Sequence, residues 1–208
     1  MSTRRWVALV AAASAIVLGG QWAVRQANEP AARQLPPTAA SLTVAPEDTG
    51  AHYDRDAWGE WQYFDGGCDR RELLLRERGQ NVVTGKACRV LAGTWVSPYD
   101  GVTVTATSGE FTPSELDVDH VVPLAEAERS GARTWTAEQR ESYANDPAVL
   151  AVVTAKSNRS KGDQDVAHWL PAQGRCEYVR QWVEIKTRYH LTADQAEVNA
   201  IAAVLDHC

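Results

Sequence analysis

The stretch that most constrains the fold of this chain is residues 117–124, DVDHVVPL, in which alternating polar and apolar residues run into a proline. The alternation predicts a β-strand over residues 116–122, and Pro123 ends it because proline has no N–H to give to a sheet. Residues 149–154 form a later apolar run of strand length, and SNRSKGD follows it shortly afterwards. Asn158 in that segment is suited to the first turn of a helix. The sequence therefore predicts two strands, the second of which leads into a helix.

Three polar residues of these segments, Asp119, His120 and Asn158, form the candidate site. Consecutive strand residues point to opposite faces, so Asp119 and His120 share one site only where the strand ends or bulges. A carboxylate and an amide oxygen suit a hard divalent cation, and a neutral imidazole takes a proton from water. Each residue alone has a structural explanation, such as an ordinary helix cap for Asn158. Together they are the groups that hydrolysis of a phosphodiester with one metal ion requires.

Charge excludes binding to nucleic acid through the overall field of the protein. The chain has 21 Lys and Arg against 27 Asp and Glu, a formal net charge of −6 at pH 7. Any contact with phosphate must then come from a local basic surface. The candidates are Arg71, in the arginine-rich run at residues 70–78, and Arg159 and Lys161 after Asn158. The alternative for each arginine of that run is that it is simply solvated on a helix.

The N-terminal segment predicts export of the rest of the chain. Arg4 and Arg5 precede residues 7–24, which carry no charge. Residues 1–25 are therefore predicted as a signal peptide or an uncleaved signal anchor, and the absence of a clear cleavage site leaves both open. An anchor would tether the protein to a membrane. Residues 26–50, rich in Ala and Pro, are predicted as a linker, and residues 51–208 as the folded domain.

Four cysteines, Cys68, Cys88, Cys176 and Cys208, fall in the predicted domain. An even number of cysteines behind an export signal indicates disulfides. Pairing them in sequence order, Cys68 with Cys88 and Cys176 with Cys208, closes two local loops, each worth on the order of 3 kcal/mol. A zinc site is the competing interpretation. It is disfavoured because no two of these cysteines have the short spacing usual in zinc sites.

The rest of the domain predicts a mixture of helices and short antiparallel strands. Strands are predicted within residues 82–104 and in the β-branched run at 102–107. Thr136 with Gln139, and Thr192 with Gln195, have the spacing of capping boxes. The predicted helices are residues 69–78, 124–130, 136–143, 178–189 and 192–208.

With these motifs the sequence resembles the HNH, or ββα-metal (His-Me finger), endonuclease family. It is most similar to exported members related to the nuclease domain of modification-dependent restriction enzymes. The core motif matches over residues 117–171. Flanking matches at GCDRR, residues 67–71, and GTW, residues 93–95, extend the resemblance to the domain from Tyr53.

The resemblance implies an α+β fold with a ββα-metal core, additional helices, small antiparallel strands and two disulfides. It implies that His120 is a general base and that Asp119 and Asn158 ligate one divalent cation, Mg²⁺ or alternatively Mn²⁺. The implied activity is endonucleolytic hydrolysis of DNA with little sequence specificity, outside the cytoplasm, giving 5′-phosphate and 3′-hydroxyl ends. Nothing in the sequence implies an obligate protein partner.

One position departs from the family pattern. The family has an Asn just before the Leu of the second strand, and this chain has Val149 before Leu150. Because that Asn orients the His, its absence leaves open how His120 is positioned, and Asn145 or a backbone carbonyl is a candidate for the role. Two alternatives to a DNA nuclease stay open. One is a disulfide-stabilised extracytoplasmic binding module on a degenerate nuclease scaffold, and the other is a ribonuclease of the same fold.

Overall fold

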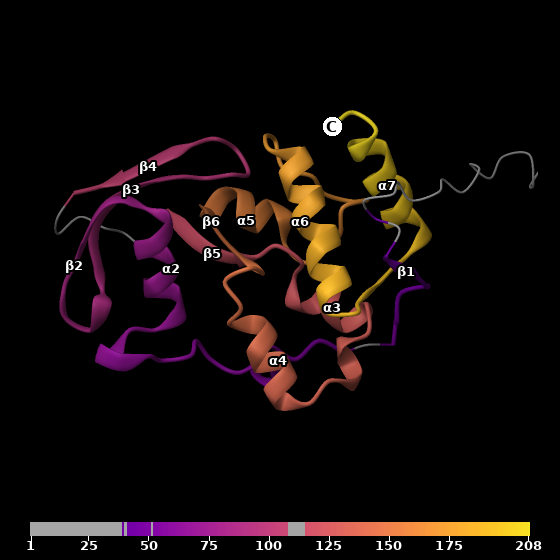
Figure 1. The fold of residues 1–208 in the computed structure, drawn as a ribbon, viewed down its shortest axis with the longest axis horizontal. Helices are drawn as coiled ribbons and strands as arrows, with labels where there is room; N and C mark the ends of the chain where they lie inside the picture. The colour runs from indigo at the N-terminus through magenta and orange to yellow at the C-terminus, as the bar shows by residue number, and fades with distance from the viewer. Residues whose placement is uncertain (1–38, 40, 51, 108–114) are drawn as a thin grey trace, which may run out of the picture. The chain divides into compact units, whose positions relative to one another are not determined.

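A computed structural model describes residues 39, 41–50, 52–107 and 115–208 (Figure 1). The predicted signal peptide or anchor, residues 1–25, lies outside the described residues. Within the ranges given above, the structure contains no helix of the length and apolar character that crossing a membrane requires.

The described part of the chain mixes helices with three small sheets, which makes it an α+β fold. The sheets have the strand orders β1-β7, β2-β3-β4 and β5-β6. In chain order the elements, with η for 3₁₀ helices, are β1 (Thr43–Val44), η2 (Arg55–Trp58), η3 (Asp65–Gly67), α2 (Arg70–Arg78), β2 (Gln80–Thr84), η4 (Lys86–Cys88), β3 (Val90–Val96), β4 (Thr103–Ala106), β5 (Leu116–His120), α3 (Leu124–Arg129), η5 (Ala132–Thr134), α4 (Ala137–Ala144), β6 (Leu150–Thr154), α5 (Ala155–Lys161), α6 (Arg175–Arg188), β7 (Thr192–Ala193) and α7 (Gln195–Leu205).

The antiparallel sheet β2-β3-β4 packs against α2; the helix and the antiparallel strands were each predicted from the sequence. The helix begins after Asp69, whose carboxylate accepts a hydrogen bond from the backbone N of Glu72. Leu74 and Leu75 on its inner face are fully buried. The indole N–H of Trp95, on β3, donates to the carbonyl of Leu75 at 2.8 Å. Apolar burial and this hydrogen bond therefore fix the helix to the sheet.

Strands β5 and β6 form an antiparallel pair that leads directly into α5. His120, the last residue of β5, lies opposite Leu150, the first residue of β6. Thr154, the last residue of β6, is also the N-cap of α5. The order of two strands and a helix is as the sequence predicted, but the helix begins at Ala155, so Asn158 is its fourth residue and not its cap. In Figure 1 these three elements lie between the β2-β3-β4 sheet and helices α6 and α7.

Capping boxes start α4 and α7, one of them two residues later than predicted. Thr136 and Gln139 form the predicted box at α4. At α7 the box is made by Asp194 and Glu197, because Thr192 belongs to strand β7. Since a strand residue cannot also cap the helix two positions early, the sequence pattern at Thr192 was misleading.

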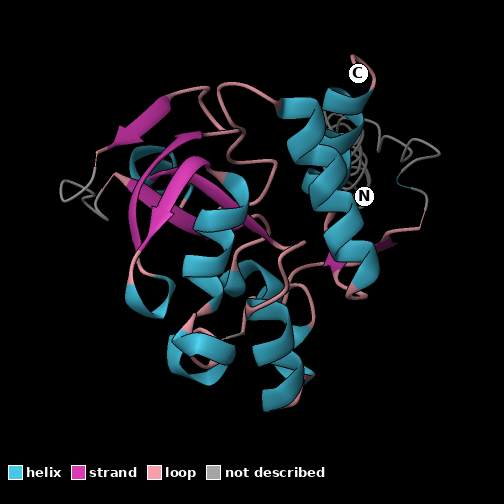
Figure 2. Cartoon of the chain, turned by 60° about the vertical axis from the view of Figure 1, so that its left-hand side comes forward, coloured by secondary structure: helices cyan, strands magenta, loops and turns pink. Residues whose placement is uncertain are grey.

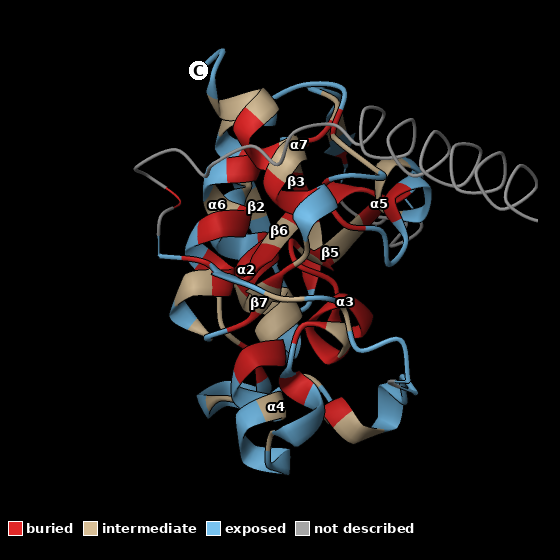
Figure 3. Ribbon diagram, turned by 90° about the vertical axis from the view of Figure 1, so that its right-hand side faces the viewer, coloured by how far each residue is buried: buried red, intermediate tan, exposed pale blue. Residues whose placement is uncertain are grey.

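The main hydrophobic core contains the fully buried rings of Trp58, Tyr143 and Trp182. Figure 2 shows the longer C-terminal helices grouped apart from most of the strands. In Figure 3 buried residues gather along the inner sides of α3 and α6, whereas α4 is exposed over much of its surface. The site-bearing strands β5 and β6 therefore rest against a large, well-packed core.

A buried ionic cluster ties α3, α6 and α7 together. The ammonium of Lys186 donates to Glu126 at 2.8 Å and to Glu197 at 2.7 Å, and all three side chains are buried. Burial raises the pKa of Glu197 to about 7, and the charge of Lys186 opposes that rise. Removing one partner of such a cluster leaves an uncompensated buried charge, so these residues act together in fixing the helices.

The folded unit begins earlier than the predicted boundary between linker and domain. Ala39 and Leu42 are buried in the main core. Residues 43 and 44 form β1, which pairs in parallel with β7. The last part of the predicted linker is therefore packed on the domain, because a few apolar side chains and an available strand edge outweigh a composition typical of a tether.

Both expected disulfides are present. Cys68 pairs with Cys88, joining the segment of η3 to that of η4, and Cys176 pairs with Cys208, joining the start of α6 to the C-terminus. The first joins two short 3₁₀ segments that have no buried residues, and the second ties the C-terminus to a core helix. Such crosslinks are typical of small exported domains.

Candidate functional site

The carboxylate of Asp119 is buried and hydrogen-bonded through both oxygens. Its exposed fraction is 7%. The hydroxyl of Tyr99 donates to one oxygen at 2.6 Å, and the ammonium of Lys161 donates to the other at 2.9 Å. Burial raises the pKa of Asp119, and the charge of Lys161 opposes that rise. Each oxygen accepts one bond here, so each keeps a lone pair for a further partner.

Lys161 lies in the interior, not on a surface that a polymer reaches. Its side chain is fully buried, and Nζ also donates to the carbonyl of His120 at 2.9 Å. Burial lowers the pKa of Lys161, and Asp119 opposes this because it stabilises the ammonium. Lys161 is one of the residues predicted from the sequence to meet substrate phosphates. In the structure its ammonium is instead the counter-ion of Asp119, since α5 turns this residue toward β5.

Asn158 faces β5, where its hydrogen-bond partner is Asp117. Its amide nitrogen donates to the carboxylate of Asp117 at 3.0 Å. Asp117 and Asp119 share one face of β5 because strand side chains alternate, and Asn158 and Lys161 share one face of α5 because they are three residues apart. The structure thus brings Asn158 to the carboxylate face of the strand, in an Asp117–Asn158 pair beside the Asp119–Lys161 pair.

The turn between β3 and β4 is hydrogen-bonded both to β5 and to the start of α5. Tyr99 bonds Asp119 on β5. The next residue, Asp100, accepts hydrogen bonds from the hydroxyls of Thr154, at 2.5 Å, and Ser157, at 2.8 Å, at the start of α5. These bonds lower the pKa of Asp100 against the opposing effect of its burial. Two adjacent turn residues therefore fix the strand and the helix relative to each other.

The imidazole of His120 is held by one hydrogen bond and two flat neighbours. Its Nε2 lies 2.9 Å from the carbonyl of Ala144. A carbonyl only accepts, so Nε2 carries the hydrogen and Nδ1 keeps its lone pair. The rings of Trp61 and Tyr143 are nearly parallel to the imidazole, with centroids 5.9 Å and 6.3 Å away. Desolvation lowers the pKa of His120 to about 4, so the ring is neutral at neutral pH.

The carbonyl of Ala144 contacts His120, whose positioning the missing family Asn left open. Val149, at the position of that Asn, is fully buried in the main core. Of the two candidates that the sequence offered, the backbone carbonyl contacts His120. The side chain of Asn145 instead bonds the backbone at residues 60–62.

The oxygen groups on this face suit a hard cation in kind and are few in number. Asp119 keeps a lone pair on each oxygen, and Asn158 donates through nitrogen, which leaves its carbonyl oxygen as a possible ligand. In the part of the chain that the structure describes, no three His, Cys, Asp or Glu side chains cluster closely enough to hold a metal ion. One carboxylate and one amide oxygen are the kinds of ligand that suit Mg²⁺, which uses one or two protein oxygens and retains several waters.

The two predicted phosphate-binding arginines have different surroundings. Arg159 is exposed and, with Lys156 on the same helix, lines a groove of about 530 Å³ between α5 and β4. Arg71 is partly buried and pairs with Glu72 at 3.2 Å. Arg159 therefore has the accessibility that contact with a polymer requires, whereas the charge of Arg71 is partly neutralised by its neighbour.

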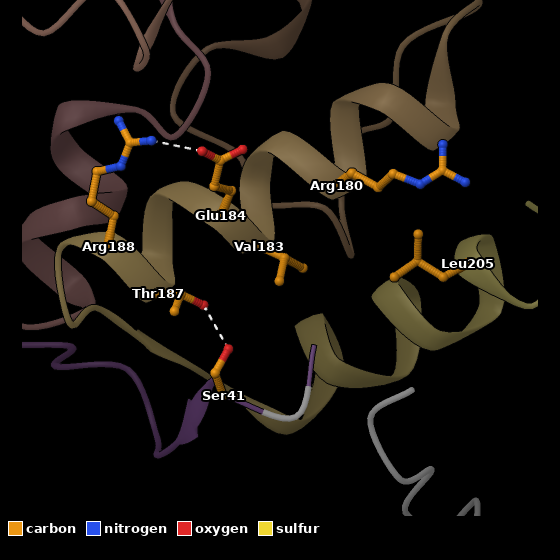
Figure 4. Close-up of a pocket in the computed structure, with 7 residues that line it drawn as sticks. All are labelled: Ser41, Arg180, Val183, Glu184, Thr187, Arg188 and Leu205. Atoms are coloured by element: carbon orange, nitrogen blue, oxygen red, sulfur yellow. Dashed lines mark hydrogen bonds and ion pairs between the residues drawn. The ribbon is translucent and has the colours of Figure 1, made fainter. Parts of the chain in front are cut away.

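A separate hollow of about 390 Å³ lies between α6, α7 and Ser41 (Figure 4). Its charged side chains are paired: Arg188 bonds Glu184 at 2.6 Å, and Arg180 bonds Glu177 at 3.2 Å. The hydroxyls of Ser41 and Thr187 are hydrogen-bonded at 3.1 Å. None of the predicted site residues lines this hollow. The candidate site residues Asp119, His120 and Asn158 lie on β5 and α5, away from this hollow.

The sequence did not predict three residues that shape the site, which are Tyr99, Asp100 and Trp61. Tyr99 and Asp100 lie in SPYDG, a pattern that predicts only a turn. Trp61 lies in an aromatic-rich stretch whose side chains are expected to pack in the interior and not to form a site. Because their roles come from contacts with residues 20 to 60 positions away, local sequence carries no signal for them.

Comparison with known proteins supports the family that the sequence motifs indicated. Residues 69–204 match the family described as "GmrSD restriction endonucleases, C-terminal domain", so this chain belongs to that family of HNH nuclease domains. A protein of Arthroderma benhamiae named "Uncharacterized secreted protein" is 40% identical over 186 residues, covering 87% of this chain and 88% of the relative. No solved structure matches the chain. The resemblance that the two motifs indicated is thereby confirmed.

Proposed function

We propose that this protein is a divalent-metal-dependent endonuclease that hydrolyses phosphodiester bonds of DNA, with little sequence specificity, outside the cytoplasm. The observation that carries the proposal is the placement of His120. His120 is the last residue of β5, next to Asp119. Its Nε2 donates a hydrogen bond to the carbonyl of Ala144, which leaves the lone pair of Nδ1 available to accept a proton. Membership of a nuclease-domain family supports the reaction class.

We interpret β5, β6 and α5 as the ββα-metal core of this family. Two features support this. The strands are antiparallel and α5 follows β6 without a loop. The strand and the helix also present polar side chains to each other, Asp117 to Asn158 and Asp119 to Lys161. The remaining helices and the β2-β3-β4 sheet are then additions that support the core.

In the reaction, Nδ1 of His120 accepts a proton from the attacking water. The water oxygen bonds to phosphorus as the bond from phosphorus to the 3′ oxygen breaks, and solvent protonates the leaving oxygen, giving 5′-phosphate and 3′-hydroxyl ends. Asp119 and Asn158 would hold the cation, Mg²⁺ or Mn²⁺. When bound, that cation supplies positive charge to the scissile phosphate and the leaving oxygen. Tyr99 and Lys161 orient Asp119 through hydrogen bonds.

The substrate would be met through phosphate and not through base edges. The chain is net negative, so a local cation must contact the backbone, and Arg159 is exposed beside Asn158 on α5. Contacts to phosphate carry no sequence information, which is why little sequence specificity is expected. DNA is preferred over RNA in this proposal by family membership alone.

The site of action would be extracellular. The Arthroderma benhamiae relative carries the word secreted in its name, and two disulfides fit an oxidising compartment. Residues 1–25 would act as the export signal or as a membrane anchor, which detection of the mature N-terminus by mass spectrometry distinguishes.

Digestion of supercoiled plasmid tests the proposal. Wild-type protein with Mg²⁺ or Mn²⁺ should nick and linearise the plasmid, EDTA should stop it, and His120→Ala should lower the rate by roughly two to four orders of magnitude. His207→Ala, near the C-terminus, is the matched control and should retain full rate. Equal digestion by wild type and His120→Ala would end the claim. Single-stranded DNA and RNA in parallel reactions reveal whether the enzyme is a ribonuclease.

One observation favours a binding module on a degenerate nuclease scaffold. Asp119 already has Lys161 as a counter-ion, so the site is neutralised without a metal. In that case calorimetry would detect no uptake of Mg²⁺ or Mn²⁺ by the purified domain. Uptake that disappears in Asp119→Asn supports the nuclease.

A further inference from the structure

We propose that Asn145 and Trp61 are positioning residues for His120: Asn145 fastens the segment that carries Trp61, and Trp61 fixes the direction of the imidazole. The inference rests on the proposed function, because it concerns the base of that reaction. In this inference Asn145 helps to orient His120, as the absent family Asn does, but it acts through the ring of Trp61 and not by direct contact.

A single hydrogen bond does not fix an imidazole. The contact from Nε2 to the carbonyl of Ala144 allows the ring to rotate about the N–H···O direction, and such rotation would swing Nδ1. Two flat neighbours parallel to the imidazole, with centroids 5.9 Å and 6.3 Å away, would limit this rotation. Trp61 and Tyr143 are inclined to the imidazole by only 1° and 8°. We call this space, bounded by Trp61, Tyr143 and the carbonyl of Ala144, the imidazole slot.

The two walls of the imidazole slot differ in how they are held. Tyr143 belongs to α4, is fully buried, and its hydroxyl donates to the carbonyl of Val122 at 2.7 Å. Trp61 lies in a stretch with neither helix nor strand and is only partly buried. Its position therefore depends on contacts that the stretch makes with the rest of the domain.

Asn145 supplies those contacts on both sides of Trp61. Its side-chain oxygen accepts from the backbone N of Gln62 at 2.8 Å, and its nitrogen donates to the carbonyl of Glu60 at 3.2 Å. The same nitrogen donates to the carbonyl of Glu141 at 3.0 Å, inside α4. With 4% exposure, Asn145 is a buried amide whose hydrogen bonds join this helix to the Trp61 segment.

The geometry couples the two restraints on the base. Ala144, whose carbonyl holds Nε2, and Asn145, whose side chain holds Trp61, are adjacent at the end of α4. The end of one helix thus sets both the hydrogen bond and the ring wall. Because a misplacement of about 1 Å can cost on the order of 10²-fold in rate, loosening either restraint should lower kcat.

Substitutions at Trp61 separate ring flatness from simple packing. Trp61→Phe keeps a flat wall and should retain kcat within a few-fold, whereas Trp61→Leu keeps apolar bulk without a flat face and should lower kcat about 10- to 100-fold. KM for DNA and the affinity for Mn²⁺ by calorimetry should stay within two-fold in both. Asn145→Ala should behave as Trp61→Leu does, and Asn199→Ala on α7 is the matched control with wild-type kinetics.

Chemical rescue gives a second readout that a purely structural role would not change. His120→Gly empties the imidazole slot, and added imidazole should restore cleavage with saturation. Combining His120→Gly with Trp61→Leu should weaken the apparent binding of imidazole at least 10-fold, whereas combining it with Asn199→Ala should not. This measurement reports on the slot directly, and it remains available where Asn145→Ala fails to fold.

The outcomes distinguish this inference from the proposed function. If His120→Ala cleaves DNA as the wild type does, the proposed function is wrong. If His120→Ala is inactive while Trp61→Leu keeps wild-type kcat, or if Trp61→Leu and Trp61→Phe lose activity equally, the positioning role is overturned and the nuclease assignment stands. Unchanged rescue by imidazole in the Trp61→Leu background overturns it as well.

Discussion

Lys161 and Asp119 form an ion pair in the interior, with Nζ 2.9 Å from the carboxylate and the lysine side chain fully buried. The pair joins α5 to β5, the two elements that carry the proposed metal ligands. A positive charge built into the chain thus compensates Asp119 where a cation would also act.

Lys161→Met should destabilise the domain by about 3–5 kcal/mol, because removing one partner of a buried pair leaves an uncompensated charge. Urea denaturation at pH 7 measures this, and Lys156→Met, exposed on the same helix, is the control. Mg²⁺ should raise the stability of Lys161→Met more than that of the wild type, since the cation would replace the lost ammonium. Equal unfolding free energies for Lys161→Met and the wild type would contradict the pairing.

Tyr99→Phe should cost about 1.5–3 kcal/mol, the usual contribution of a hydrogen bond to a charged group. The hydroxyl donates to Asp119 at 2.6 Å, and the ring is buried beside Trp169 and Tyr178. Thermal and urea unfolding test the change. Tyr63→Phe, at a position that is 71% exposed, should leave stability within about 0.5 kcal/mol of the wild type.

The stability of the domain should fall as the pH decreases from about 6.5 to about 4. The pKa of His120 is lowered from 6.5 to about 4 by desolvation, so in this window the unfolded chain binds a proton that the native state does not. This contribution to stability is complete above pH 6.5 and is lost progressively below it. His120→Gln, which does not titrate, should show a shallower slope in denaturation curves collected across this range. An identical slope for both proteins would place the pKa of His120 elsewhere.

DNA cleavage should remain close to its maximal rate at pH 5.5, because the base is still neutral there. A histidine in water, with a pKa near 6.5, would be mostly protonated at that pH and unable to accept a proton. The profile of kcat/KM between pH 4 and 8 at saturating metal measures this. An acid limb centred between pH 6 and 7 would show that His120 is hydrated in the working enzyme.

Replacing Cys176 and Cys208 together by serine should lower the free energy of unfolding by about 3.7 kcal/mol, the loop-closure value for a crosslink with a sequence separation of 32. The bond joins the start of α6 to the C-terminus, whereas the site residues lie on β5 and α5. The rate of DNA cleavage at 25 °C should therefore match that of the wild type while the unfolding midpoint falls. A parallel loss of kcat at temperatures where the protein is folded would link this disulfide to the site.

Local patterns in the sequence predicted most elements and the identity of the candidate residues. The alternation before Pro123 placed β5, the spacing of Thr136 and Gln139 placed α4, and four cysteines in order gave both disulfides. These predictions succeeded because each depends on residues close together in the sequence or on the small number of ways in which four cysteines can pair. The predicted cap at Thr192 was wrong because Thr192 lies in β7 and pairs with β1, which is far away in the sequence.

The sequence by itself determined the family, the α+β class, and the presence of an Asp and a His on one strand and an Asn on a later helix. Only the tertiary structure decided which partner each acquired: Lys161 for Asp119, Asp117 for Asn158, and the carbonyl of Ala144 for His120. The physical reason is that an unpaired buried polar group is costly, so most buried polar groups are hydrogen-bonded, and the partner is whichever group the packing of distant segments brings within hydrogen-bond distance.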